Sequence, residues 1–178
     1  MKFLVLGIGN IMFADEGLGV HLCKLLEKNY KFTHKTHILD FVDGGTLALQ
    51  LSYIIAEYDK MIVLDCIDAD DGKIGDVFFF PYDAMPKKIN WSGSAHEVEM
   101  LQTLQYVELM GDLPQTQILA CIPKRIEAMS FTLSKEIVTA SKIMEKTFLD
   151  YIKKEGFDYD KIANHSLEEL AEISYKSF

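Results

Sequence analysis

Four polar residues follow apolar, strand-like segments and are the best candidates for a chemical site. Glu16 and Asp43 follow the first two such segments. Asp65 closes the third, and His96 opens the helical segment that comes after the next one. In open parallel sheets, ligands bind beyond the carboxyl ends of the strands, so side chains at these places converge. A carboxylate pair with an imidazole suits a borderline divalent cation and leaves coordination positions open.

Each of these residues also has a simpler explanation. Glu16 would interact favourably with a helix dipole, and Asp43 before Gly-Gly-Thr would form a turn or cap a helix. His96 would be an ordinary residue at the start of a helix. Asp65 is harder to explain in this way, because an acid in a buried central strand costs free energy unless it has a partner. Spacing alone leaves both interpretations open.

A nucleotide site is disfavoured. Gly7 and Gly9 lie at a strand-to-helix turn, as in the dinucleotide-binding fingerprint, but the third glycine position is occupied by Met12. The acid that binds the ribose is also missing from its usual place, since the second strand-like segment ends in a Gly-Gly loop.

Other catalytic and metal-binding motifs are incomplete. The acidic run 68–71 lacks the spacing and the closing Glu of a calcium loop, so a solvated turn is the better interpretation. His96 and the Glu after it are not followed by the second histidine of the zincin helix. Cys66 and Cys121 lie within apolar segments, where free cysteine acts as a small buried hydrophobe, and this disfavours a cysteine protease.

Alternating strand and helix segments would position the candidate residues. Short, apolar runs typical of buried strands cover residues 2–8, 36–42, 60–66, 75–82 and 116–122. Apolar residues at helical spacing cover residues 17–30, 47–58, 96–110 and 134–154. Strands that are apolar throughout and alternate with helices indicate a parallel sheet covered on both faces.

The sequence therefore predicts the α/β class, as a three-layer α/β/α sandwich. Its sheet would be mostly parallel, with about five strands, and the aromatic-rich segment 75–82 could run antiparallel at an edge. Residues 1–155 are interpreted as one α/β domain, and residues 156–178 as a C-terminal tail. Ser166 and Glu169 form a capping-box pattern, which predicts a short, loosely packed helix in this tail.

Composition narrows the class of partner and the compartment. The net charge of −9 argues against nucleic acid, whose binding surfaces concentrate Lys and Arg. The three cysteines are not paired in spacing, which fits a reducing compartment. Acids follow the broken N-terminal apolar run, unlike a signal peptide, and no apolar stretch reaches the ~18 residues that span a bilayer. We expect a cytoplasmic monomer without membrane insertion.

Three local motifs together resemble the hydrogenase maturation endopeptidase family. They are Gly7-Ile8-Gly9-Asn10 through Asp15-Glu16-Gly17-Leu18-Gly19, then Asp43-Gly44-Gly45-Thr46, then Ser94-x-His96. Asp65 falls where the family has its second metal-binding acid. The resemblance covers roughly residues 1–150, and the first loop, residues 12–14, and the tail depart from common family patterns.

The resemblance implies a nickel-dependent endopeptidase that removes the C-terminal extension of a hydrogenase large-subunit precursor. Glu16, Asp65 and His96 would bind nickel, which belongs to the precursor and acts as a checkpoint. Other divalent ions, such as cadmium or zinc, can substitute in purified protein. The family is grouped with aspartic-type peptidases, and residues 1–155 would form the peptidase domain. Our hypothesis is that the metal polarises either a water molecule or the scissile carbonyl, and that Asp43, as base or orienting group, assists the hydrolysis.

Two alternatives come from other functional classes. A non-enzymatic nickel carrier or hydrogenase assembly chaperone would use the same three ligands, would depend weakly on Asp43 and would leave the precursor mass unchanged. A nucleotide-binding module is opposed by the broken glycine fingerprint, and nucleotide titration would test it.

Overall fold

The computed structural model describes residues 1–46, 48–67, 72–84 and 95–176, with the backbone alone at 48, 49, 95–99 and 175. The run 68–71, interpreted above as a solvated turn, lies outside this part of the chain.

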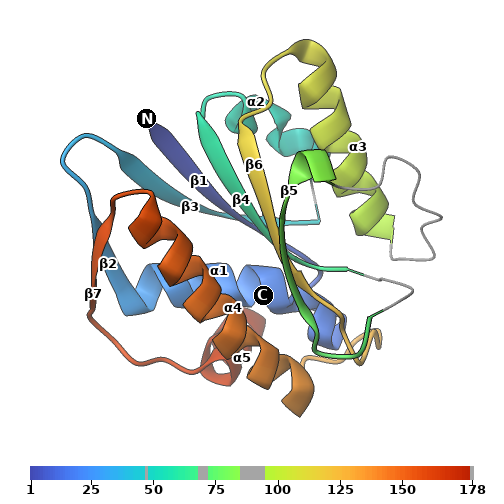
Figure 1. Ribbon diagram of the computed structural model, residues 1–178. Coiled ribbons are helices and arrows are strands. Elements are labelled where there is room, and N and C mark those ends of the chain that lie inside the picture. Colours follow the sequence, from blue (N-terminus) through green and yellow to red (C-terminus); the bar gives the residue numbers. More distant parts are fainter. Residues whose placement is uncertain (47, 68–71, 85–94, 177–178) are drawn as a thin grey trace.

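A five-stranded sheet forms the centre of the molecule (Figure 1). Its order is β3-β1-β4-β6-β5. The first four strands run parallel, and β5 pairs antiparallel with β6 at the edge. The prediction of a mostly parallel sheet with one antiparallel edge strand is confirmed. The bounds are β1 (Lys2–Ile8), β3 (Ile38–Gly45), β4 (Lys60–Cys66), β5 (Val77–Pro81) and β6 (Gln115–Cys121).

Helices cover both faces of this sheet, as Figure 1 shows. On one face lie α1 (Leu18–Asn29), α4 (Lys135–Lys154) and α5 (Leu167–Lys176). On the other lie η2 (Ala48–Leu51), α2 (Ser52–Ile55) and α3 (Ala95–Met110). Short 3-10 turns form η1 (Ala14–Gly17) and η3 (Tyr82–Ala84). None of the helices in the described residues is both long enough and apolar enough to cross a membrane.

Both faces of β1 are covered, which explains why its sequence carries no polar side chain from Phe3 to Ile8. Phe3 and Val5 belong to the core on the α1 side, whereas Leu4 and Leu6 belong to the core on the α3 side. Successive strand residues point to opposite faces, so a strand covered on both sides has no polar positions. This confirms the three-layer sandwich. In place of the single helix predicted over residues 47–58, η2 covers Ala48–Leu51 and α2 covers Ser52–Ile55.

The C-terminal tail packs more firmly than its polar sequence predicts. A second, two-stranded antiparallel sheet joins β2 (Tyr30–Thr33) to β7 (Asp158–Lys161). The side chains of Phe157, Leu167 and Leu170 are 2–3% exposed and belong to the core beside α1. Helix α5 begins with the expected capping box, in which Ser166 Oγ accepts from the amide of Glu169 at 3.1 Å and Glu169 Oε2 accepts from the amide of Ser166 at 2.8 Å. The expectation of loose packing was wrong.

Candidate metal and catalytic site

Glu16 lies on η1, the turn that joins β1 to α1. Its side chain is 2% exposed. Gly9 makes this turn possible, because it has a φ of +141° and a Cβ built on it would lie 1.9 Å from the carbonyl oxygen of Glu16. The amide of Gly9 also donates to the carbonyl of Gly45, two residues beyond Asp43, at 3.0 Å. Gly9 therefore joins the turn of Glu16 to the end of β3.

Replacing Gly9 by Ala is expected to lower the free energy of unfolding by more than about 3 kcal/mol, because both its φ and its contact exclude a side chain. Gly111→Ala is the matched control, since Gly111 has a φ of +81° but a Cβ added there would meet no atom within 4 Å. That variant should lose only about 1 kcal/mol. Urea unfolding measures both, and equal losses would contradict the steric argument.

Asp65 lies at the end of β4, and the chain brings this strand end against η1. Its side chain is 6% exposed, and its Oδ1 accepts from the amide of Cys66 at 2.8 Å. The Sγ of Cys66 donates to the carbonyl of Asp15 at 3.2 Å. The residue after Asp65 thus contacts the residue before Glu16, which places two buried acids on touching segments.

His96 lies in the first turn of α3, where the structure describes only the backbone. The described side chains include no group of three His, Cys, Asp or Glu residues placed to hold a metal ion, and the imidazole of His96 is not among these side chains. The metal set predicted from the sequence therefore remains a prediction.

Asp43 lies at the opposite side of β1 from Asp65. It pairs in register with Gly7 on β1, close to the end of both strands. Its Oδ1 accepts from the amide of Gly45 at 3.1 Å, and its Oδ2 forms an ion pair with Lys24 Nζ at 2.8 Å. The side chain is 41% exposed. A charged carboxylate held from both oxygens therefore faces solvent at the carboxyl edge of the sheet.

Helix α5 also reaches this part of the molecule. Lys24 Nζ, which pairs with Asp43, donates to Ser174 Oγ at 3.3 Å. Ser174 is 7% exposed, on the side of α5 that packs against α1. The tail thus helps to hold the Lys24 ammonium group that pairs with Asp43.

His21 is a buried imidazole on α1, one turn before Lys24. It is 2% exposed, and within the described chain its Nδ1 has no hydrogen-bond partner. Burial, helped by the charge of Lys24, lowers the pKa of His21 to about 4, while the charge of Asp43 opposes this shift. The imidazole is therefore neutral at neutral pH.

The burial of His21 predicts a loss of stability at mildly acidic pH. The unfolded chain, with a histidine pKa near 6.5, binds a proton more readily than the folded chain does, so stability falls as pH drops from about 6.5 towards 4. From pH 7 to pH 5 the contribution of His21 amounts to about 2 kcal/mol. Urea unfolding at both pH values should show this loss, and His21→Leu should reduce it by that amount. An unchanged pH dependence in the variant would refute the assignment.

The free cysteines do not form a nucleophilic site. Cys23, Cys66 and Cys121 are all buried. A hydrogen bond with Cys121, together with burial, raises the pKa of Cys66, and burial raises the pKa of Cys23 to about 12. The thiols of Cys23 and Cys66 stay protonated at neutral pH, as the sequence interpretation of buried cysteines predicts.

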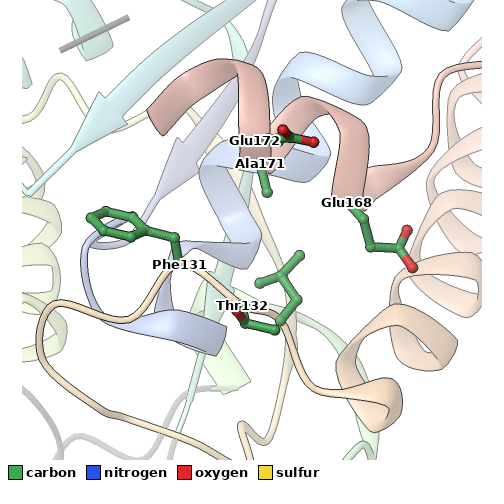
Figure 2. Close-up of a pocket in the computed structure, with 6 residues that line it drawn as sticks. Phe131, Thr132, Glu168, Ala171 and Glu172 are labelled. Atoms are coloured by element: carbon green, nitrogen blue, oxygen red, sulfur yellow. The ribbon is translucent and has the colours of Figure 1, made fainter. Parts of the chain in front are cut away.

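None of the four candidate residues lines the pocket shown in Figure 2. This pocket, of about 270 Å³, lies between the segment 131–133 and α5. Figure 2 shows Ala171 pointing from α5 towards this segment, with Glu168 and Glu172 on the same helix. It is separate from the carboxyl ends of β3 and β4.

Three residues near the candidates were not singled out from the sequence. They are Asp15, His21 and Lys24. His21 and Lys24 offered one signal, their position. They follow Gly17 at helical spacing of four and seven residues and so share a face of α1, the face from which Lys24 pairs with Asp43 on β3. Asp15 stands in the first family motif, but nothing in the sequence indicates its partners, which lie far along the chain.

Comparisons with known proteins agree on one family. A family model described as hydrogenase maturation protease matches residues 20–151. The chain is 48% identical to Protein HydD of Wolinella succinogenes over 160 residues, which cover 89% of this chain and 100% of that protein. It is 29% identical to the hydrogenase 2 maturation protease of Escherichia coli over 128 residues, 71% of this chain and 76% of that protein.

A solved structure shares the fold. The hydrogenase maturating endopeptidase HybD from Escherichia coli superposes with a TM-score of 0.80 at 23% identity, covering 91% of this chain and 98% of that one. The three-layer sandwich with an antiparallel edge strand is therefore the fold of that protein too. With the family match over most of the sheet and its helices, these findings show that the chain belongs to the hydrogenase maturation protease family.

Proposed function

We propose that this protein removes the C-terminal extension of a nickel-loaded hydrogenase large-subunit precursor. Membership of the maturation protease family makes the chain a peptidase. One observation supports recognition of the nickel. Glu16 and Asp65 are both buried and lie on segments that touch through Cys66 and Asp15. Together with His96, these acids would recognise the metal.

The residues present suit this metal. Carboxylate and imidazole ligands bind borderline divalent ions such as nickel, and thiolates of a precursor would supply the softer ligands. Burial strengthens the attraction between a carboxylate and a cation, so a cation arriving with the substrate has a large favourable interaction to make. An empty precursor offers no such charge, and the metal thereby acts as the checkpoint.

Asp43 would act on the peptide bond rather than on the metal. Its carboxylate is held by Lys24 and by the amide of Gly45, and its partial exposure leaves lone pairs accessible to a water molecule. A carboxylate in this position can orient the attacking water or take its proton. Binding to nickel would polarise the water or the scissile carbonyl. This role agrees with the aspartic-type grouping that the family resemblance implies.

The test uses purified protein with nickel-loaded and nickel-free precursor, and follows the intact precursor by mass spectrometry. We expect loss of one discrete C-terminal peptide from the loaded sample alone. Cleavage of both samples would refute the nickel checkpoint, and cleavage of neither would refute the proposed peptidase substrate. In samples without precursor, cadmium or zinc should occupy the same ligands.

A non-enzymatic nickel carrier is not favoured, because the family match is to proteases. In the same mass measurement, a carrier would move nickel while the precursor mass stayed constant. We further propose that the protein works as a monomer in the cytoplasm. The three free, buried cysteines support a reducing compartment such as the cytoplasm.

A further inference from the structure

The carboxylate of Asp15 is buried completely, with 0% exposure, and accepts three hydrogen bonds from backbone donors. Its Oδ2 accepts from the amides of Lys124 and Arg125 at 3.1 and 2.9 Å. Its Oδ1 accepts from the amide of Ser134 at 2.7 Å. These donors lie at both ends of residues 122–134, the segment between β6 and α4 that we call the arm.

The backbone of the same turn is also bound to the arm. The amide of Asp15 donates to the carbonyl of Arg125 at 3.2 Å, and the amide of Ala14 donates to the carbonyl of Ser130 at 2.6 Å. Phe13 and Ser130 form an isolated parallel bridge. Ala14 and Met129, on the two sides of this contact, both have positive φ, at 53° and 60°. Non-glycine residues rarely take this conformation, so the contact constrains both segments.

The carbonyl of Asp15 contacts the end of β4. It accepts from Cys66 Sγ, beside Asp65 at the end of β4. Asp15 therefore touches the arm through its carboxylate and β4 through its carbonyl, and it is covalently joined to Glu16. Hydrogen bonds from the arm and from β4 thus converge on this one residue. Residues 131–133 lie in the arm between Arg125 and Ser134, two of the residues that bind Asp15. Figure 2 shows this part of the arm beside α5.

We propose that Asp15 is a positioning residue that fixes Glu16 relative to Asp65 and couples both to the arm. This inference rests on the proposed function, in which the two acids read the metal of the precursor. Partners that orient metal ligands typically contribute ~10–100-fold to metal affinity or activity. The same order of effect is expected when the hold of Asp15 is weakened, although Asp15 itself touches neither metal nor substrate.

Ser134 allows a test that leaves Asp15 in place. Its φ of −71° is compatible with proline, and Ser134→Pro removes the amide that donates to Oδ1. Ser134 Oγ also caps α4 by accepting from the amide of Ile137 at 3.3 Å. Ser134→Ala removes this cap but keeps the amide, so it is the matched control for α4 stability. Asp15→Asn provides a second variant, in which an amide group replaces one acceptor oxygen.

Two readouts separate positioning from simple destabilisation. Hydrogen–deuterium exchange at residues 13–17 should quicken in Ser134→Pro and Asp15→Asn but not in Ser134→Ala. On nickel-loaded precursor, kcat/KM should fall by ~10-fold or more in the first two variants, mainly through a higher KM, because Glu16 binds the metal. A smaller folded fraction would lower apparent kcat and leave KM unchanged.

Unchanged exchange at residues 13–17, or a loss in kcat alone, would overturn the assignment of Asp15. The exchange measurement needs no precursor, so it stays informative if the wild-type protein proves to cleave neither precursor. In that case the proposed function fails, while quickened exchange still supports the hold of Asp15 on the Glu16 turn.

Discussion

Replacing Asp43 by Asn is expected to lower the rate of cleavage of nickel-loaded precursor by roughly 100-fold or more, the usual contribution of a general base. An amide cannot accept the proton of the attacking water, and it also loses the ion pair with Lys24. Binding of the precursor should change little, because Asp43 lies apart from the acids that would read the metal. Single-turnover cleavage, followed by intact mass, measures the rate.

Asp40→Asn is the control for this prediction. Asp40 lies on the same strand, three residues before Asp43, and its Oδ2 accepts from the hydroxyl of Tyr58 at 3.1 Å. Its contact with Tyr58 involves neither Lys24 nor Gly45, the partners of Asp43, so its removal should leave the cleavage rate within a few-fold of wild type. If Asp43→Asn cleaves as fast as Asp40→Asn, Asp43 has no catalytic role.

Replacing Glu16 by Gln or Asp65 by Asn is expected to weaken binding of the nickel-loaded precursor by about 100-fold or more, since each change removes a direct, charged ligand. Binding of the nickel-free precursor should not change. Calorimetric titration with both precursors measures this difference.

Asp59→Asn is the matched control for the metal-reading acids. Asp59 precedes β4, at the opposite end of the strand that ends at Asp65, and accepts from the amide of Lys2 at 2.7 Å. This variant should bind both precursors as the wild type does. Equal binding of the loaded precursor by Asp65→Asn and Asp59→Asn would exclude Asp65 as a ligand.

The sheet could be predicted from the sequence because its strands are covered on both faces. Strands β1 and β4 are apolar at nearly every position, and their bounds agree with the predicted residues 2–8 and 60–66. Strand β7 could not be predicted, since Asp158–Lys161 consists of three charged residues and one tyrosine and so lacks an apolar pattern. Its pairing depends on β2, far away in the sequence, and on the contact of Tyr159 with Tyr30.

Strand ends also placed the candidate acids, because parallel strands bring their carboxyl ends to one edge of the sheet. Glu16 and Asp65 lie on segments that touch, as this rule predicts. The groups that hold these segments could not be predicted. Asp15 binds Arg125 across 110 positions, and Lys24 binds Ser174 across 150, so neither contact leaves a local pattern.

X-ray absorption at the nickel edge would test whether Glu16, Asp65 and His96 bind the nickel of the precursor. The sample is the complex of nickel-loaded precursor with the Asp43→Asn variant. We expect additional oxygen and nitrogen ligands around nickel compared with the precursor alone, and their loss when Asp65→Asn is added to the variant. Identical nickel spectra for the complex and the free precursor would contradict this expectation, because the metal would then not be bound by Glu16, Asp65 and His96.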